Sequence, residues 1–198
     1  AFTVVAPSLP AYGLSFAPGQ PRFSVEQFAD AFASLMSQSL GYRRFATQGG
    51  DWGASISARL GLVHAERTIG VHLNLLPLRR DPAALVDDDD AARWLSEETG
   101  YSTQQGTRPQ TLAFALTDSP VGLAAWIVEK MRAWSDCNGD IESAFSKDEI
   151  LANVSLYWFT GAIGSSFWPY YARQHGAWPI SDGETVDVPI GYCDLPKE

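Results

Sequence analysis

The pattern of hydrophobic and polar positions divides the 198 residues into parts with different expected structure. Short runs of apolar and β-branched residues are typical of buried strands, whereas apolar residues spaced three or four apart are typical of helices. On these criteria the first part of the chain is predicted as strand, helix, strand, helix and strand, at residues 2–6, 24–41, 43–48, 52–63 and 68–76. Because this alternation is typical of a parallel sheet with crossover helices, we predict an α/β fold.

The first predicted helix carries a start signal and a stop signal. Ser24 is followed three residues later by Gln27, a capping box in which each side chain bonds the other residue's backbone N–H. Gly41 comes directly after the last apolar position, where a glycine often ends a helix. The sequence therefore predicts both ends of this helix.

From Pro77 onward the pattern becomes helical. Three stretches with helical spacing follow one another without a convincing strand between them, at residues 87–98, 119–134 and 147–159. The chain then alternates again and is rich in β-branched residues at 184–193. We therefore predict an α/β core that carries a helical cap as an insertion, with the core at 1–76, the cap at 77–178 and a return to the core at 179–198.

Composition narrows the range of partners. The chain has 14 Lys and Arg against 23 Asp and Glu, a net charge of −9, and it has no basic block, which argues against nucleic acid or an anionic membrane surface. No apolar run approaches the roughly 18 residues that span a membrane. Cys137 and Cys193 lack the spacing of a disulfide framework or a zinc site, so we expect a cytoplasmic protein without a metal or cofactor. The four aspartates at 87–90 are predicted as a solvated helix start.

One short stretch carries candidate chemistry. Gly49, Gly50, Asp51, Trp52 and Gly53 stand between a predicted strand and a predicted helix, which matches the nucleophile elbow G-x-Nu-x-G. In such an elbow the tight turn holds the central side chain out above the sheet, and the N–H of the next residue can donate to an oxyanion. The alternative is a glycine-rich turn in which the aspartate caps the helix.

An aspartate at this position narrows the reaction further. A serine that attacked an epoxide or an alkyl halide would form an ether, which water does not readily cleave. A carboxylate instead forms an ester, whose carbonyl carbon an activated water can attack. The residue type therefore favours substrates that react at a saturated carbon.

Several segments resemble the microsomal-type epoxide hydrolases of the α/β-hydrolase fold. They are spread over most of the chain and read FTVVAPSLPAYGLSFAP, QGGDWGASI, GTRPQTLAFALTDSPVGLAAWIVEKMRAW, LYWFTGAIGSSFWPYY and VPIGYCDLPKE. The resemblance implies hydrolysis of an apolar epoxide to a vicinal diol. It implies that Asp51 is the nucleophile and that Trp52 supplies an oxyanion N–H. It also implies that Tyr101 and Tyr170 donate to the epoxide oxygen, and the adjacent Tyr171 is the alternative to Tyr170 if the register differs by one.

The same resemblance requires a histidine and an acid to hydrolyse the ester. The acid falls on Glu198, with Asp194 and Asp187 as nearby alternatives. The three histidines lie elsewhere and lack the family's Gly-Gly-His context, so we expect structural roles for His64, His72 and His175. The family's His-Gly-x-Pro loop is also absent. We therefore expect a piece of a longer protein, which alone would be poorly soluble or inactive.

Two rival functions remain open at this stage. A haloalkane dehalogenase also uses an elbow aspartate and holds the leaving halide with indole N–H groups, for which the candidates are Trp52, Trp126, Trp158 and Trp168. A non-catalytic binding protein of the same fold could hold an apolar ligand in the aromatic-rich cap, with Trp94, Trp126, Trp134, Trp158, Phe167 and Trp168 as the lining.

Overall fold

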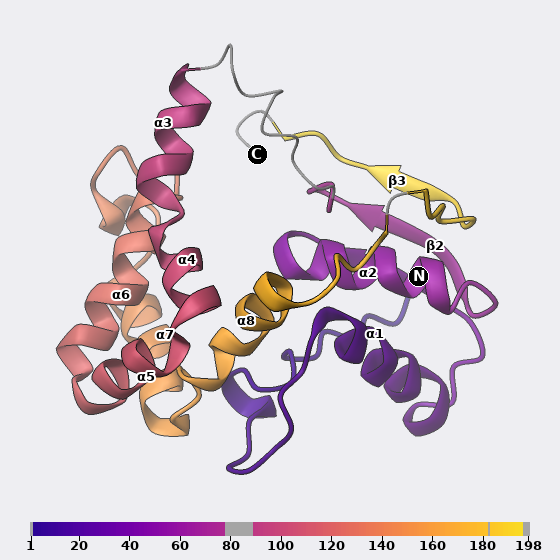
Figure 1. Cartoon of the computed structure of the whole chain (residues 1–198), viewed down its shortest axis with the longest axis horizontal. Helices are drawn as coiled ribbons and strands as arrows, with labels where there is room; N and C mark the ends of the chain where they lie inside the picture. The colour runs from indigo at the N-terminus through magenta and orange to yellow at the C-terminus, as the bar shows by residue number, and fades with distance from the viewer. Residues whose placement is uncertain (1, 78–88, 182, 196–198) are drawn as a thin grey trace. The chain divides into compact units, whose positions relative to one another are not determined.

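A computed structural model describes residues 2–77, 89–181 and 183–195 of the chain. Contacts between residues divide it into two compact units (Figure 1). The helical unit comprises Ala1–Arg22 with Ser102–Tyr171, and the sheet unit comprises Phe23–Tyr101 with Ala172–Glu198. The predicted division into core, cap and return segment stays a prediction.

The sheet unit holds three parallel strands, as the sequence predicts. β1 (Phe45–Gly49), β2 (Thr68–Leu73) and β3 (Ile190–Tyr192) lie in the order β1-β2-β3. Gly49 pairs with Leu73, and Leu73 pairs with Tyr192. The carboxyl ends of all three strands therefore form one edge of the sheet, the edge where ligands bind in open α/β sheets.

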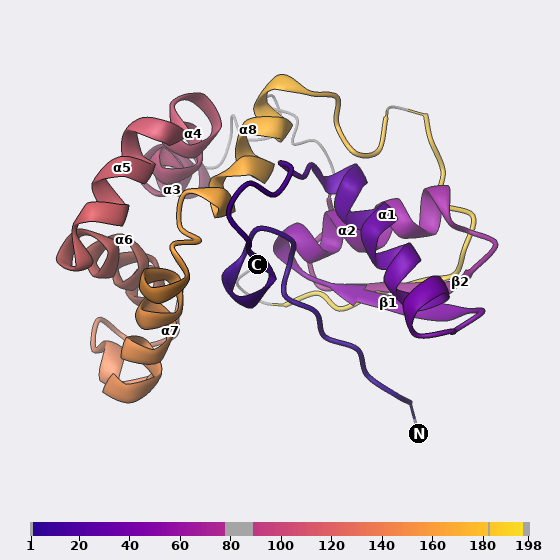
Figure 2. The same cartoon turned by 90° about the horizontal axis from the view of Figure 1, so that it is seen from below.

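Two helices accompany these strands. Figure 2 shows α1 (Val25–Ser34) and α2 (Asp51–Val63) on the same face of β1 and β2. Ala54 of α2 is buried against Val71 and Leu73 of β2. A β-carbon on Gly61 would lie 2.8 Å from a methyl carbon of Val71. The small residues of α2 thus let this helix lie close to the sheet.

The signals at the ends of α1 are confirmed. The Ser24 N–H donates to Gln27 Oε1 over 2.8 Å, and the capping box is complete. After Ser34 the helix continues as one π-helical segment, η2 (Leu35–Ser39). Gly41 then has φ of +74°, a conformation that glycine adopts without strain.

The expected strand at residues 2–6 is wrong. Phe2 and Val4 are 93% and 83% exposed, and this segment pairs with none of the strands in the described sheet. A run of β-branched residues marks only a candidate strand, because a strand forms by pairing its backbone with a neighbour. The last strand is also shorter than expected, since only Ile190–Tyr192 of the alternating stretch 184–193 joins the sheet.

The middle of the chain is helical, as predicted. Its helices are α3 (Asp89–Glu98), α4 (Gly100–Thr107), α5 (Pro109–Asp118), α6 (Pro120–Ala133), α7 (Lys147–Thr160) and α8 (Trp168–His175), with short 3₁₀ turns η4 (Ile141–Ser143) and η5 (Ser165–Phe167). The sequence pattern did not predict α4, α5 or α8. Of the predicted helix 87–98, positions 87 and 88 lie outside the described residues.

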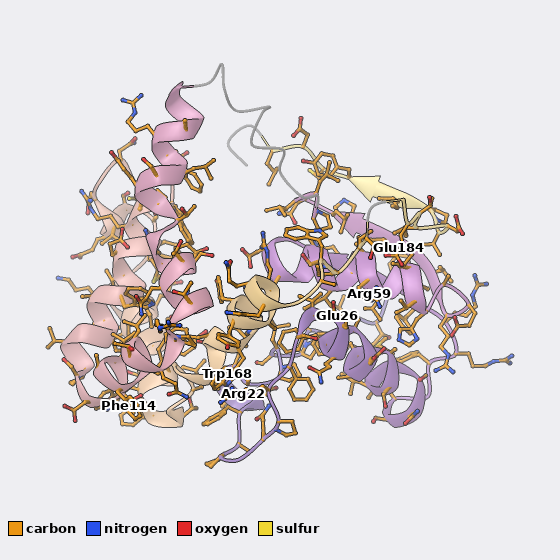
Figure 3. The ribbon with its side chains drawn as sticks, in the orientation of Figure 1. Arg22, Glu26, Arg59, Phe114, Trp168 and Glu184 are labelled. Atoms are coloured by element: carbon orange, nitrogen blue, oxygen red, sulfur yellow. The ribbon has the colours of Figure 1, made fainter. Side chains whose placement is uncertain are left out.

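The helical unit has its own apolar core. Leu123 and Phe167 are buried at 0% and 1% exposure, together with Ala113, Leu116, Val154 and Ile163. Phe114 points away from this core on α5 and is exposed (Figure 3). The segment around η1 (Gly13–Ser15) joins the unit because Tyr12 Oη donates to the Ser166 carbonyl over 2.7 Å.

By length and composition, no single helix among the described residues could cross a membrane. Only α5 and α6 taken together would qualify, and the break between them bends the pair by 117°. Cys137 and Cys193, both among the described residues, are free thiols; Cys137 is buried and Cys193 is exposed.

Candidate active site

Asp51 occupies the turn between β1 and α2. It is the first residue of α2, its side chain is exposed, and its φ is +47°. A left-handed backbone costs a residue with a β-carbon about 1–2 kcal/mol, and such strain persists only where the surroundings fix it. The structure thus confirms a sharp strand-to-helix turn, with Asp51 at its centre in a strained backbone conformation.

The glycines around Asp51 show what fixes this turn. A β-carbon on Gly49 would lie 2.2 Å from the carbonyl carbon of Gly53, and one on Gly50 would lie 2.4 Å from Oδ1 of Asn74. A β-carbon on Gly53 would meet nothing within 4 Å. The backbone of Gly53 therefore excludes a β-carbon at Gly49, whereas a β-carbon at Gly50 would have to displace the Asn74 side chain and one at Gly53 has room. No local sequence pattern indicates the contact with Asn74, because that residue follows a different strand, β2.

The Asp51 carboxylate lies at the N-terminus of α2. The backbone N–H of Trp52 donates to Asp51 Oδ1 over 2.5 Å, and the N-terminus of α2 adds the positive end of the helix dipole. The Trp52 indole is 8% exposed, and the guanidinium carbon of Arg173 lies 5.7 Å from its ring centroid. The N–H that would face an oxyanion is thus directed at the nucleophile itself.

The two predicted phenol donors lie on different helices. Tyr101 is the second residue of α4 and belongs to the sheet unit, together with Asp51. Tyr170 lies on α8 and belongs to the helical unit. Both side chains are half-buried, whereas Tyr171 is exposed. The roles of all three remain predictions.

The candidates for the catalytic acid differ in their position relative to the carboxyl edge of the sheet. Glu198 lies outside the described residues. Asp194 follows β3, at the same carboxyl edge of the sheet as Asp51, and the preceding Cys193 N–H donates to the Leu73 carbonyl over 2.8 Å. Asp187 precedes β3 and so lies toward the opposite edge. The assignment of the acid stays a prediction.

The histidines occupy positions consistent with the structural roles that we predicted. His64 follows the last residue of α2, and its Nε2 lies 2.8 Å from Asp30 Oδ1 of α1. Since α2 has 13 residues and rises about 1.5 Å per residue, His64 and Asp51 stand at opposite ends of it. His72 alternates with the buried Val71 and Leu73, so its side chain points to the face of the sheet away from α2. His175 is the last residue of α8.

Several aromatic residues of the predicted cap take part in packing. Phe167 is part of the buried core, and Trp126 and Trp158 pack against that core. Trp168 is covered by Arg22, whose guanidinium carbon lies 3.7 Å from the ring centroid (Figure 3). Trp94 and Trp134 are exposed. The halide site and the apolar ligand site remain predictions that these contacts do not test.

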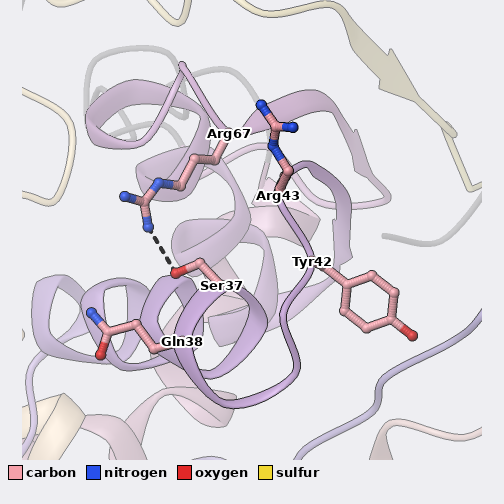
Figure 4. Close-up of a pocket in the computed structure, with 5 residues that line it drawn as sticks. All are labelled: Ser37, Gln38, Tyr42, Arg43 and Arg67. Atoms are coloured by element: carbon pink, nitrogen blue, oxygen red, sulfur yellow. Dashed lines mark hydrogen bonds between the residues drawn. The ribbon is translucent and has the colours of Figure 1, made fainter.

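Asp51 lines neither of two hollows found among the described residues. One, of about 370 Å³, is lined by Ser37, Gln38, Tyr42, Arg43 and Arg67, and Arg67 Nη1 donates to Ser37 Oγ over 2.7 Å (Figure 4). Its two arginines precede β1 and β2, so it lies at the amino edge of the sheet. The other, of about 230 Å³, belongs to the helical unit.

Comparisons with known proteins show which family this fold belongs to. The family described as "alpha/beta hydrolase fold" matches residues 1–124. A putative epoxide hydrolase of Stigmatella aurantiaca is 40% identical over 100% of this chain and 46% of its own length. Epoxide hydrolase 1 of Sus scrofa is 35% identical over 100% of this chain and 50% of its own length.

Solved structures show the same likeness. Juvenile hormone epoxide hydrolase from the silkworm Bombyx mori superposes with a TM-score of 0.76 at 31% identity, over 93% of this chain and 50% of that one. The Aspergillus niger epoxide hydrolase gives a TM-score of 0.73 at 27% identity, over 96% and 49%. The chain spans about half the length of the curated relatives that it matches. With its parallel sheet and its strained elbow aspartate, the chain belongs to the microsomal-type epoxide hydrolase family of the α/β-hydrolase fold.

Proposed function

We propose that this chain supplies the nucleophile of an epoxide hydrolase and that Asp51 attacks a carbon of an apolar epoxide. The observation that carries the proposal is the left-handed backbone of Asp51, which holds an exposed carboxylate at the carboxyl edge of a parallel sheet. The names of the relatives support an epoxide as the substrate.

In the first step an Asp51 carboxylate oxygen bonds to the less hindered epoxide carbon. The bond between that carbon and the ring oxygen breaks, and the ring oxygen leaves with the electron pair. It takes a proton from a phenol, for which Tyr101 and Tyr170 are the proposed donors. A phenol with a pKa of about 10 keeps its proton at neutral pH and can yield it to a basic alkoxide. The product is a hydroxyalkyl ester of Asp51.

In the second step water attacks the carbonyl carbon of this ester. The acyl C–O bond breaks and the Asp51 carboxylate is restored, while the backbone N–H of Trp52 donates to the transient oxyanion. One water proton passes through a general base to the leaving oxygen of the diol, and the other restores the phenol that gave its proton in the first step. A general base must take a proton from the water, and Glu198 is the proposed acid that orients it. His64 is bonded to Asp30 at the far end of α2, so we do not assign it this role. We expect the chain alone to stop at the ester.

Intact-mass spectrometry after incubation with styrene oxide tests the proposal. We expect the chain to gain the mass of one epoxide and peptide mapping to locate it on Asp51. The Asp51→Asn variant should gain nothing, whereas Asp118→Asn, which changes another exposed aspartate, should react as the parent does. Equal labelling of Asp51→Asn and the parent would overturn the mechanism.

A further inference from the structure

The chain returns from α8 to β3 along one face of α2. Arg59 Nη1 donates to the Pro179 carbonyl over 2.9 Å, and Arg173 lies over the Trp52 ring. Trp52 and Arg59 are seven residues apart, two helical turns, so both side chains lie on the same face of α2. The returning segment 173–179 is therefore fastened to α2 at two points, one of them in the turn that carries Asp51.

The fastening at the elbow is a stack of three side chains. The guanidinium carbon of Arg173 lies 4.3 Å from the Trp178 ring centroid and 5.7 Å from that of Trp52. Both distances are within the roughly 6 Å over which a cation and an aromatic face attract each other. A guanidinium is flat and stacks on indole faces, a geometry that an ammonium group lacks. Arg173 thus holds the Trp52 indole from the side of the return segment.

The third member of the stack is itself anchored. Trp178 Nε1 donates to the Pro77 carbonyl over 3.0 Å. Pro77 is buried and lies a few residues after β2, where the chain leaves the sheet. The Trp178 side chain therefore joins the segment that follows β2 to the segment that leads to β3. Arg173 contacts both indole rings and so links Trp52 to this joined pair.

We propose that Arg173 is a positioning residue for the nucleophile and acts through Trp52. The strained φ of Asp51 needs contacts that fix it, and the Trp52 N–H holds Asp51 Oδ1. Holding the Trp52 indole in place, as a clamp does, fixes the orientation of the Trp52 backbone N–H. Because this N–H donates to Asp51 Oδ1, it also fixes the orientation of the carboxylate that attacks. The inference rests on the proposed function for its catalytic consequence. The clamp itself is a structural claim with its own test.

Two readouts on the full chain separate these claims. The first is hydrogen–deuterium exchange of the amides at residues 51–54, which needs no substrate. The second is the rate of adduct formation at increasing styrene oxide concentrations, which separates the maximal rate from the half-saturating concentration. The variants are Arg173→Leu, Arg173→Lys and the matched control Arg59→Leu, which loosens the same segment two turns away.

We expect Arg173→Leu to speed amide exchange at 51–54 and to lower the maximal alkylation rate at least about tenfold, because small misplacements of reacting groups have large effects on rate. The half-saturating concentration should stay the same. Arg173→Lys should restore part of the rate, since a cation over the rings remains. Arg59→Leu should leave both readouts near those of the parent.

Each failure has a distinct meaning. If the parent chain forms no Asp51 adduct, the proposed function falls, and exchange alone then decides whether the clamp exists. Unchanged exchange at 51–54 in both Arg173→Leu and Arg173→Lys would overturn the clamp, as would equal losses of rate in Arg59→Leu and Arg173→Leu. If Arg173→Leu does not fold, Arg173→Lys still tests the proposal, since loss of planar stacking should lower its maximal rate.

Discussion

Gly49 lies so close to Gly53 that no β-carbon fits between them: one built on Gly49 would stand 2.2 Å from both the carbonyl carbon and the carbonyl oxygen of Gly53. The last residue of β1 therefore touches the backbone of the first turn of α2. This contact sets the tightness of the turn, and the tightness of the turn holds Asp51 in its left-handed conformation.

The contact predicts opposite outcomes for two glycine-to-alanine changes. Gly49→Ala should lower the free energy of unfolding by at least about 2 kcal/mol, because the clash is with backbone that cannot move aside. Gly53→Ala meets nothing within 4 Å and should be neutral or stabilising, since alanine favours a helix over glycine by about 1 kcal/mol. Urea unfolding followed by circular dichroism measures both. A larger loss in Gly53→Ala would contradict the geometry.

A second prediction concerns the contact that the sequence did not reveal. A β-carbon on Gly50 would lie 2.4 Å from the Asn74 side chain, so Gly50→Ala should destabilise the chain. Because the obstacle is a side chain, Asn74→Ala should relieve part of that loss. In a double-mutant cycle the two changes should therefore couple by about 0.5–3 kcal/mol. Additive effects would show that Asn74 does not confine Gly50.

These contacts show which features a sequence can predict. The capping box of Ser24 and Gln27 and the turn at Asp51 were predictable because the residues involved are neighbours along the chain. The segment 2–6 was predicted wrongly because its β-branched residues indicate propensity, while a strand needs a partner. The stack of Trp52, Arg173 and Trp178 joins parts of the chain more than a hundred residues apart. No local pattern marks such a contact.

A third prediction concerns the pH dependence of α7. The Ser146 N–H and hydroxyl both donate to Glu149 Oε2 over 2.8 Å, and these bonds, the backbone one first, lower the pKa of Glu149. A carboxyl whose folded pKa is lowered stabilises the fold above its unfolded pKa and loses this effect as the pH falls through its folded pKa.

Glu149→Gln should therefore cost stability at neutral pH, and this cost should fall away only as the pH drops below about 4, the ordinary range of a glutamate, and through the lower pKa of the folded state. The matched control is Gln27→Ala in the uncharged capping box of α1, whose cost should not change over the same range. Urea unfolding of both variants at neutral pH and at a pH below the folded pKa of Glu149 measures the difference. An equal cost of Glu149→Gln at both values would show that the carboxylate charge contributes nothing.

The last prediction separates His64 from the chemistry of Asp51. His64 Nε2 is 2.8 Å from Asp30 Oδ1, and this pair joins the end of α2 to α1. Partly exposed pairs of this kind are worth at most about 1 kcal/mol, so His64→Gln should lower stability by no more than that. Because His64 stands about 20 Å from Asp51 along α2, the rate of Asp51 alkylation should not change. Asp30→Asn breaks the same pair from the other side and should behave alike. A slower alkylation in His64→Gln than in Asp30→Asn would assign the imidazole a part in the reaction and would contradict its structural role.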